Sequence, residues 1–311
     1  MEELKVGFIG LGIMGEAMAL NLIKNKISLN IYNRTYEKVL KLIENGAIYL
    51  KTPKEIIKNS NIVFLMLSDD NACDEIFNGK EGIIEGLRDI SSYRSNEPNI
   101  SGKFINSGSK KYIINFSTIS PDFSINLYKG VAEAGAYYLE APVIGSKIPA
   151  IEAKLIIVTA GDNEAFEKSK NFLYMMGSKI IYTGEIPNAS QIKIVNNMIM
   201  GAMISAYSEG LIMARKLNLD LELVYDILNS GAFSNSMFAI KGKNMLKNNF
   251  ETNFPYKHMQ KDLGYGLMLS EKNKYFLPNL AVANETFKLG LKKYGDEDMS
   301  AIYKTIADSN K

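Results

Sequence analysis

Apolar and polar positions alternate along the N-terminal part of the chain in the manner of strands connected by helices. Continuous apolar runs at residues 4–9 and 62–67 are typical of strands that are buried on both faces of a sheet. A further strand is expected at 28–32, and the apolar spacing of 16–25 and 36–45 is helical. Strands that alternate with helices at this spacing predict an α/β fold with a doubly wound, mostly parallel sheet.

A polar stretch interrupts this alternation between Asp89 and Lys111. It is rich in Ser, Asn and Gly and lacks apolar periodicity, so we predict a solvated insertion loop at about 89–111. Beyond it the alternation resumes. The expected elements are strands at 112–116, 137–140, 155–160 and 179–183 and helices at 123–134 and 164–175.

The pattern changes after Gly184. Residues 189–217 form one helical run that is apolar around much of its circumference, which is typical of a helix buried inside an assembly. We therefore predict a homodimer or a homotetramer. The further expected helices are 221–229, 237–248, 260–273 and 278–292. The chain is thus predicted to have an α/β domain at 1–186 and an all-helical domain at 187–311, joined by the long helix.

Three glycines follow the first strand in the pattern G-x-G-x-x-G. The pattern alone is weak evidence, but here it follows a strand and opens a helix within a strand–helix–strand unit. Glycines in this context permit a tight turn and the close approach of a pyrophosphate to the free N–H groups of the helix N-terminus. The alternative is a turn that only packs the strand against the helix. We interpret it as the cofactor-binding turn of a Rossmann domain, made by Gly10, Leu11, Gly12, Ile13, Met14 and Gly15.

The second strand ends in Asn33, Arg34 and Thr35. A site selective for NAD usually places Asp or Glu here, because a carboxylate binds the ribose 2′-hydroxyl and repels a 2′-phosphate. Arg34 is instead a planar donor suited to a phosphate. The alternative is a solvated surface arginine. The residues predict NADP(H) as the cofactor.

Lys193 is the candidate for proton transfer. Asn197 follows four residues later, so both side chains project from one face of the long helix. Most lysines within helices are solvated charges, but the apolar neighbours Ile192 and Ile194 indicate that this helix is not freely exposed. The single histidine, His258, could also relay a proton, although a lone histidine is more often structural.

Two loops that follow strands could complete a pocket, because ligands of open α/β sheets meet the carboxyl ends of the strands. One loop reads FSTISP (116–121), and the other reads EAPVIGSK (140–147). The second offers backbone N–H groups around Gly145 and Ser146 to a carboxylate. Each could equally be an ordinary strand-to-helix turn.

Composition narrows the class of partner. The net charge is +2, from 36 basic and 34 acidic side chains. So small a net charge gives no electrostatic field that would attract nucleic acid or a membrane, and it favours a small-molecule substrate. Cys73 is the only cysteine, which excludes an internal disulfide and fits a reducing compartment. No apolar run approaches the roughly 18 residues of a membrane helix. The first strand leaves no room for a cleaved presequence, so we expect a cytoplasmic protein. We predict no metal site.

Taken together, these segments resemble the β-hydroxyacid dehydrogenase family, and its glyoxylate/succinic semialdehyde reductase branch more than 3-hydroxyisobutyrate dehydrogenase. The resemblance covers nearly the whole chain apart from 89–111. Its motifs are GFIGLGIMG (7–15), NRT (33–35), MLSD (66–69), STISP (117–121), EAPVIGSK (140–147), QIKIVNNMIMG (191–201) and KHMQKDL (257–263). It implies a Rossmann domain, a long interdomain helix, an all-α domain and an active site between the domains.

The resemblance also implies roles for individual residues. Lys193 matches the family's catalytic lysine and Asn197 its supporting asparagine. The other matched positions are Thr118, Lys261, Met66 and Leu67 at the cofactor, and Thr118, Gly145, Ser146, Phe254 and Asp262 at the substrate. The substrate loop departs from the pattern, because the family usually has Ser before the loop glycine and this chain has Ile144. A hydroxyl that could bind the substrate carboxylate is thereby replaced by a hydrocarbon.

The predicted activity is the NADPH-dependent reduction of a small aldehyde acid, of the glyoxylate or succinic semialdehyde type, with Lys193 as proton donor. The first alternative is an NAD(P)-dependent dehydrogenase of the 3-hydroxyisobutyrate type, which Arg34 disfavours because NADP pools generally favour reduction. The remote alternative is a non-catalytic binding module, as in relatives that attach this fold to chromatin-binding segments. Imine reductases share the architecture, but they typically replace the lysine.

Overall fold

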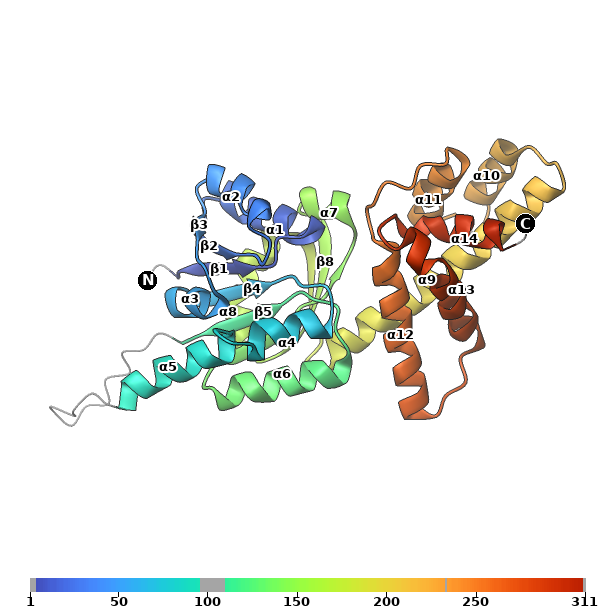
Figure 1. Cartoon of the computed structure of the whole chain (residues 1–311). Coiled ribbons are helices and arrows are strands. Elements are labelled where there is room, and N and C mark those ends of the chain that lie inside the picture. The colour runs from blue at the N-terminus through green and yellow to red at the C-terminus, as the bar shows by residue number, and fades with distance from the viewer. Residues whose placement is uncertain (1–3, 96–109, 233, 310–311) are drawn as a thin grey trace. The chain divides into compact units, whose positions relative to one another are not determined.

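A computed structural model describes residues 4–95, 110–232 and 234–309. The chain divides into two compact units, Met1–Lys193 and Ile194–Lys311. The division falls within the helix α9 (Asn188–Lys216), later in the chain than the boundary expected at 186–187. Figure 1 shows the α/β unit in blue to yellow-green and the helical unit in yellow to red.

The first unit is built on one sheet, which confirms the predicted fold class. Its strands are β1 (Val6–Ile9), β2 (Leu29–Tyr32), β3 (Ile48–Tyr49), β4 (Ile62–Leu65), β5 (Tyr112–Asn115), β6 (Tyr137–Glu140), β7 (Val143–Ile144), β8 (Leu155–Gly161) and β9 (Gly177–Tyr182). The strand order is β3-β2-β1-β4-β5-β6-β8-β7, and β9 pairs with β8. All pairs among β1–β6 are parallel, whereas β8 runs antiparallel to β6 and β7. In register, Ile9 lies beside Tyr32 and Leu65, so three strands end together at one edge.

Both faces of this sheet are covered by helices. One core gathers α1 (Ile13–Lys24), α2 (Leu40–Glu44), α7 (Lys147–Ile151) and α8 (Asn163–Tyr174) against one face. The other gathers α3 (Pro53–Asn59), α4 (Asp70–Asn78), α5 (Ile83–Ser95) and α6 (Pro121–Glu133). The strands alternate between the two cores: Phe8 and Phe64 belong to the first, and Ile9 and Val63 to the second. The continuous apolar runs are therefore explained by burial on both faces.

Helix α5 extends into the segment that the sequence predicted as a loop. It continues from Asp89 to Ser95, and Lys54 and Lys58 of α3 both bind the Asp89 carboxylate, at 2.8 and 2.6 Å. A hydrogen bond from Ser91 Oγ to the Leu87 carbonyl lies along the same helix. The rest of that predicted loop, 96–109, lies outside the described residues. The expected helix at 36–45 is also divided, into the short 3₁₀ helix η1 (Tyr36–Lys38) and α2.

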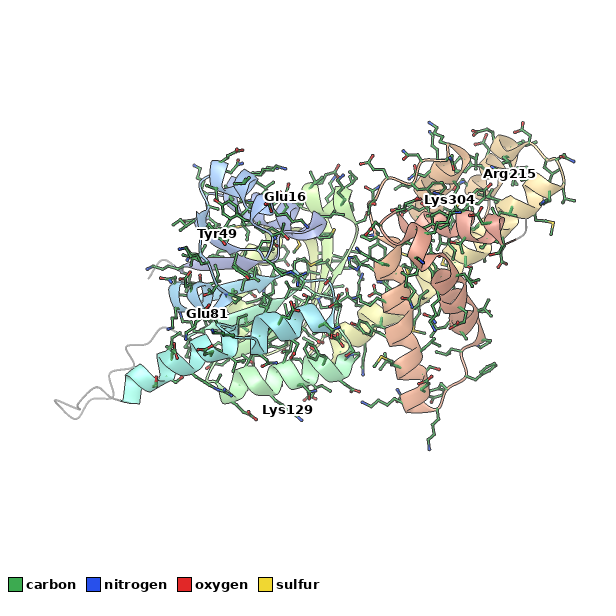
Figure 2. All side chains as sticks on the ribbon, viewed as in Figure 1. Glu16, Tyr49, Glu81, Lys129, Arg215 and Lys304 are labelled. Atoms are coloured by element: carbon green, nitrogen blue, oxygen red, sulfur yellow. The ribbon has the colours of Figure 1, made fainter. Side chains whose placement is uncertain are left out.

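The second unit is all-helical. After the remainder of α9 come α10 (Leu221–Ser230), α11 (Ser236–Leu246), α12 (Tyr256–Asn273), α13 (Pro278–Tyr294), η2 (Met299–Ala301) and α14 (Ile302–Asp308). Helices α9 and α12 approach closely at Gly201, where an added Cβ would lie 2.7 Å from Leu263 Cδ2. Two cations lie over aromatic rings of this unit, Arg215 over Tyr303 and Lys304 over Tyr294. Figure 2 labels both cations. Among the described residues, no helix combines the length and apolarity needed to cross a membrane.

Candidate active site

The glycine turn lies between β1 and α1, as the sequence predicted. Gly10 has φ +93°, and an added Cβ would lie 2.3 Å from the Met66 carbonyl oxygen. A Cβ on Gly15 would lie 1.9 Å from the Gly10 carbonyl oxygen. Gly12, at the N-cap of α1, has nothing within 4 Å of a Cβ position. Two of the glycines are therefore required by packing, and the third leaves open space at a helix N-terminus, where a pyrophosphate fits.

A pocket of about 190 Å³ extends from this turn past the end of β2. It brings together seven of the predicted cofactor residues: Gly10, Gly12, Asn33, Arg34, Thr35, Met66 and Leu67. Asn33 holds the two sides of the pocket together, because its Oδ1 accepts from Leu11 N at 2.9 Å and its Nδ2 donates to the Thr35 carbonyl at 2.8 Å. The glycine turn and the β2 end are thus joined by one side chain.

The same pocket contains charged groups that the motifs did not indicate. Arg34 forms an ion pair with Glu75 of α4 at 2.8 Å, and the two side chains are 78% and 64% exposed. Lys38 also lines the pocket. Glu75 was missed because α4 comes from another part of the chain, and its contact with β2 exists only in the folded sheet.

The loop after β5 is held against the loop after β4. Leu67 N donates to Ser117 Oγ at 2.9 Å, and Ser117 N donates to Asn115 Oδ1 at 3.1 Å. Ser120 donates to the Asp70 carboxylate through both N and Oγ, at 2.8 and 2.6 Å. Thr118 lies half-buried between these two fixed serines. It does not line the 190 Å³ pocket at the end of β2.

The substrate-loop residues surround the short strand β7. Ile144 pairs with Ile156 of β8, and its half-buried side chain packs on the apolar cluster of Val158, Ala160 and Ala189. Gly145 has φ +130°, which favours glycine, and Ser146 is the N-cap of α7. Ile144 is therefore partly accounted for by packing within this unit.

Lys193 lies on the buried side of α9. Its residue is 6% exposed, whereas the apolar neighbours Ile192 and Val195 are 43% and 50% exposed. Ile194, the next residue, is fully buried, so the lysine lies on a covered part of the helix, where lysines are rarely found. An ammonium held out of water in this way is typical of a functional group or of a buried polar network.

The start of α9 is held by Glu140, at the end of β6. Glu140 Oε1 accepts from Ala189 N and Ser190 N at 2.9 and 3.0 Å, and Oε2 accepts from the hydroxyls of Ser124 and Ser190, each at 2.5 Å. Burial raises the pKa of this carboxyl above its usual value, against the opposing effect of these hydrogen bonds. The sequence interpretation missed Glu140, although it opens the motif EAPVIGSK.

In the helical unit, three predicted residues form one cluster. Asn197 is fully buried, and its Nδ2 donates to Asp262 Oδ2 at 2.5 Å. Asp262 Oδ1 lies 3.1 Å from Lys261 Nζ, and Lys261 Nζ is 4.9 Å from the centre of the Tyr265 ring. The predicted supporting asparagine is therefore oriented by the predicted aspartate.

Phe254 is placed by a different carboxylate. Asp298 Oδ2 accepts from Asn253 N and Phe254 N at 3.1 and 3.0 Å, and the buried Lys241 ammonium binds the same carboxylate at 2.7 Å. Burial alone would raise the pKa of Asp298, but the ammonium and the Ser300 hydrogen bonds outweigh it and hold the pKa below its usual value. His258 is half-buried on α12.

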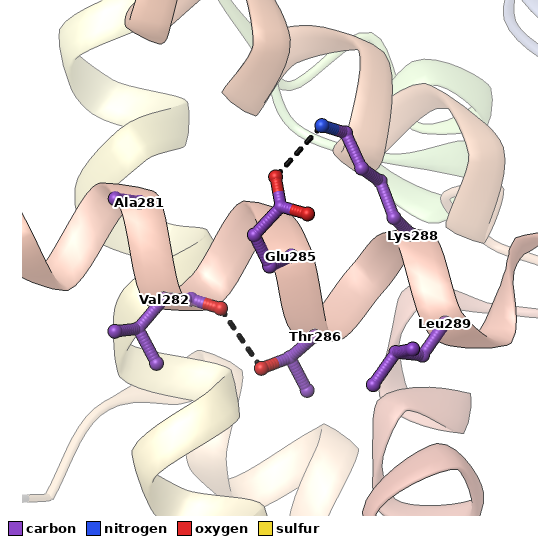
Figure 3. Close-up of a pocket in the computed structure, with 6 residues that line it drawn as sticks. All are labelled: Ala281, Val282, Glu285, Thr286, Lys288 and Leu289. Atoms are coloured by element: carbon purple, nitrogen blue, oxygen red, sulfur yellow. Dashed lines mark hydrogen bonds and ion pairs between the residues drawn. The ribbon is translucent and has the colours of Figure 1, made fainter.

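A further hollow, of about 530 Å³, lies along α13 (Figure 3). All six residues that line it come from this one helix, and its charged groups, Glu285 and Lys288, bind each other at 2.7 Å. It has the character of a helix surface rather than of a reaction site. Within 4–95, 110–232 and 234–309, no group of three or more His, Cys, Asp or Glu side chains could hold a metal ion.

Known proteins match both units. Residues 5–184 match the family described as the NAD binding domain of 6-phosphogluconate dehydrogenase, and residues 188–306 match that described as NAD-binding of NADP-dependent 3-hydroxyisobutyrate dehydrogenase. Glyoxylate/succinic semialdehyde reductase 1 of Arabidopsis thaliana is 37% identical over 97% of this chain and 98% of that protein. The chloroplastic reductase 2 of the same plant is also 37% identical, over 97% of this chain and 79% of that protein. A solved structure titled as Psf3 with NADP+ and 2-OPP has a TM-score of 0.83 at 21% identity, covering 97% of this chain and 99% of that one.

Proposed function

The chain belongs to the β-hydroxyacid dehydrogenase family and is an NADP-dependent oxidoreductase, and on this premise we propose that it reduces a small aldehyde acid to the corresponding hydroxy acid. The substrate type is that of glyoxylate or succinic semialdehyde. Its support is the 37% identity, over nearly the whole chain, to reductases named for these two substrates.

The residues at the carboxyl edge of the sheet suit the cofactor. The open space at Gly12 receives the pyrophosphate, and Asn33, Arg34 and Thr35 receive the adenosine ribose with its 2′-phosphate. When bound, the reduced nicotinamide supplies a hydride to the carbonyl carbon of the substrate. We further propose that Thr118 and Lys261 contact the cofactor.

Lys193 is the proton donor in this proposal. As the carbonyl oxygen gains negative charge, a positively charged Nζ stabilises it and then transfers a proton to it, which leaves a neutral amine and a hydroxyl. Burial strengthens this effect, because a charge in a low-dielectric site acts more strongly than one in water. The 6% exposure of Lys193, beside the fully buried Ile194 on the same helix, is the observation that carries the proposal.

Asn197 and Asp262 support that lysine. The Asn197 amide has two N–H donors, and Asp262 takes one of them, which fixes the orientation of the side chain. Its Oδ1 accepts from Asn196 Nδ2 at 2.9 Å, and Lys193 lies one turn earlier on the same face of α9. We assign Phe254 to the wall of the substrate site.

The substrate carboxylate is assigned to the loop after β6. Backbone N–H groups of Gly145 and Ser146 supply donors, and Ile144 supplies a hydrocarbon edge beside them. Such a site favours an acid whose carbon chain contacts Ile144 while its carboxylate meets the backbone.

The test is a steady-state screen of NADPH and NADH oxidation with glyoxylate, succinic semialdehyde and methylmalonate semialdehyde. We expect NADPH to be preferred and at least one acid to be reduced. Lys193→Ala should lower kcat by about 10²–10⁴-fold, the usual contribution of a general acid. Lys216→Ala, an exposed lysine at the end of the same helix, is the matched control. An unchanged rate in Lys193→Ala would remove Lys193 from the mechanism.

The reverse reaction, oxidation of a β-hydroxy acid, uses the same residues and is separated from reduction by comparing kcat/KM in the two directions. For assembly we propose a homodimer or homotetramer, supported by exposed apolar residues along α9 such as Ile199 and Met213. A cytoplasmic location also remains a proposal.

A further inference from the structure

The ion pair between Arg34 and Glu75 lies on the wall of the 190 Å³ pocket. Arg34 follows β2 and Glu75 belongs to α4, so the pair joins two elements that line that pocket, at 2.8 Å. Arg34 is the group assigned to the 2′-phosphate. In the structure, this group already binds a carboxylate of the protein itself.

Helix α4 is held so that Glu75 faces the pocket. Its N-terminus is capped by Asp69, whose Oδ1 accepts from Ala72 N at 2.9 Å, and its buried side carries Cys73 and Phe77 in the core. The pocket is lined by Ala72, Glu75 and Ile76, which share one face of the helix. The position of Glu75 is thus set by capping and core packing rather than by the exposed ion pair, which contributes little by itself.

The charged residues of the pocket determine how Glu75 affects the binding of a 2′-phosphate. Three charged residues line it: Arg34, Lys38 and Glu75. A 2′-phosphate carries up to two negative charges, so it is attracted by the two cations, repelled by Glu75, and in competition with Glu75 for the Arg34 guanidinium. A ribose with a free 2′-hydroxyl meets no such repulsion, and a carboxylate can accept its hydrogen bond.

We propose that Glu75 is a specificity-determining residue that lowers the preference of this enzyme for NADP over NAD by competing with the 2′-phosphate for Arg34. The inference rests on the assignment of Arg34 to the 2′-phosphate. It predicts that the protein retains some affinity for the dinucleotide that lacks this phosphate.

The test measures binding of two cofactor fragments to the full chain by isothermal titration calorimetry: adenosine 2′,5′-bisphosphate, which has the 2′-phosphate, and 5′-AMP, which lacks it. Glu75→Gln keeps the shape and an acceptor oxygen but removes the charge. We expect it to tighten bisphosphate binding by about two- to fivefold at low salt and to change 5′-AMP binding less than twofold. The gain should shrink in 0.5 M NaCl, where charges are screened. The ratio of kcat/KM for NADPH to that for NADH should rise in parallel.

Two further variants make the result decisive. Glu85→Gln removes a carboxylate from an ion pair of the same length, Lys54–Glu85 at 2.8 Å, outside the pocket, and should leave both fragments unaffected. Arg34→Ala should weaken the bisphosphate and spare 5′-AMP. If Arg34→Ala weakens the bisphosphate but Glu75→Gln does not tighten it, the role of Glu75 is refuted while the cofactor assignment stands. If neither variant changes bisphosphate binding, both the role of Glu75 and the assignment of Arg34 are refuted.

Discussion

Glu140 offers the sharpest test of how the fold holds the helix that carries Lys193. Its carboxylate accepts two backbone N–H groups at the start of α9, from Ala189 and Ser190, and two hydroxyls, from Ser124 and Ser190. The hydroxyls can rotate toward other acceptors, but the N–H groups cannot. Glu140→Ala therefore leaves two fixed donors buried without an acceptor, and each costs about 1–3 kcal/mol. We expect a loss of about 2–6 kcal/mol in the free energy of unfolding.

Glu140→Gln separates the hydrogen bonds from the charge. The amide oxygen still accepts from both N–H groups, and the amide nitrogen faces hydroxyls that can accept from it. We expect a loss of about 1 kcal/mol. Urea unfolding followed by circular dichroism measures both variants, and Glu152→Ala, which removes an exposed carboxylate, is the control. Equal losses in the alanine and glutamine variants would show that the caps do not depend on an acceptor at position 140.

The same residue predicts a pH dependence. Because burial raises the pKa of Glu140, the folded protein holds this proton more tightly than the unfolded chain, in which the pKa of a glutamate is about 4.3. The stabilisation is fully present below that unfolded pKa and is lost as the pH rises through the higher folded pKa. In Glu140→Gln this loss should disappear, so its unfolding free energy should fall less between pH 4 and pH 8. If the unfolding free energies of Glu140→Gln and of the unmodified protein change with pH in parallel, Glu140 does not cause this pH dependence.

Four other substitutions test separate steps. Gly12→Ala adds a Cβ to open space, so this variant should keep its Tm and bind NADPH more weakly. Gly15→Ala adds a Cβ 1.9 Å from a carbonyl oxygen, so it should lower the Tm in a thermal melt. Asp298→Asn leaves the buried Lys241 ammonium without its carboxylate and should cost about 3–5 kcal/mol in urea unfolding. The pKa of Asp298 is lowered in the folded protein, so its ionised carboxylate stabilises the fold above the pKa it has in the unfolded chain. This stabilisation is lost as the pH falls through the folded-state pKa, so the unfolding free energy of Asp298→Asn should fall less steeply at acid pH than that of the unmodified protein. Ile144→Ser should lower KM for the acid substrates about fivefold or more without raising kcat, because the added hydroxyl donates a hydrogen bond to the substrate carboxylate. An unchanged KM would show that the substrate carboxylate does not bind at this loop.

The elements that the sequence predicted well are those whose signal is local. β1 and β4 have continuous apolar runs because helices cover both faces of the sheet, and α9 has apolar residues around much of its circumference. Helix α3 was missed although it has a local signal: Thr52 Oγ1 accepts from Glu55 N, and Glu55 Oε2 accepts from Lys51 N. This is a capping arrangement followed by a proline at the first turn, and it could have been identified.

The side chains that were missed at the site depend on contacts between distant segments. Arg34 was predicted because it ends a strand next to a glycine motif, and the NADP(H) assignment is confirmed by the family. Glu75 meets Arg34 from 41 residues away, and Glu140 meets Ser190 from 50 residues away. No periodicity in the chain encodes such pairs, because they follow from the strand order and from the packing of α4 and α9. The catalytic role of Lys193 remains a prediction.

Helix α9 links these observations, because buried carboxylates hold it on both sides of Lys193. Glu140 fixes its first turn through two N–H groups, and Asp262 fixes Asn197, one turn after the lysine. A lysine has four rotatable bonds, so an ammonium that is to meet one carbonyl oxygen must have its backbone held before its side chain can be ordered. If both anchors serve this purpose, Glu140→Gln and Asp262→Asn should each lower kcat more than they raise KM. The double variant should then lose less than the product of the two single losses, since either one already frees the lysine.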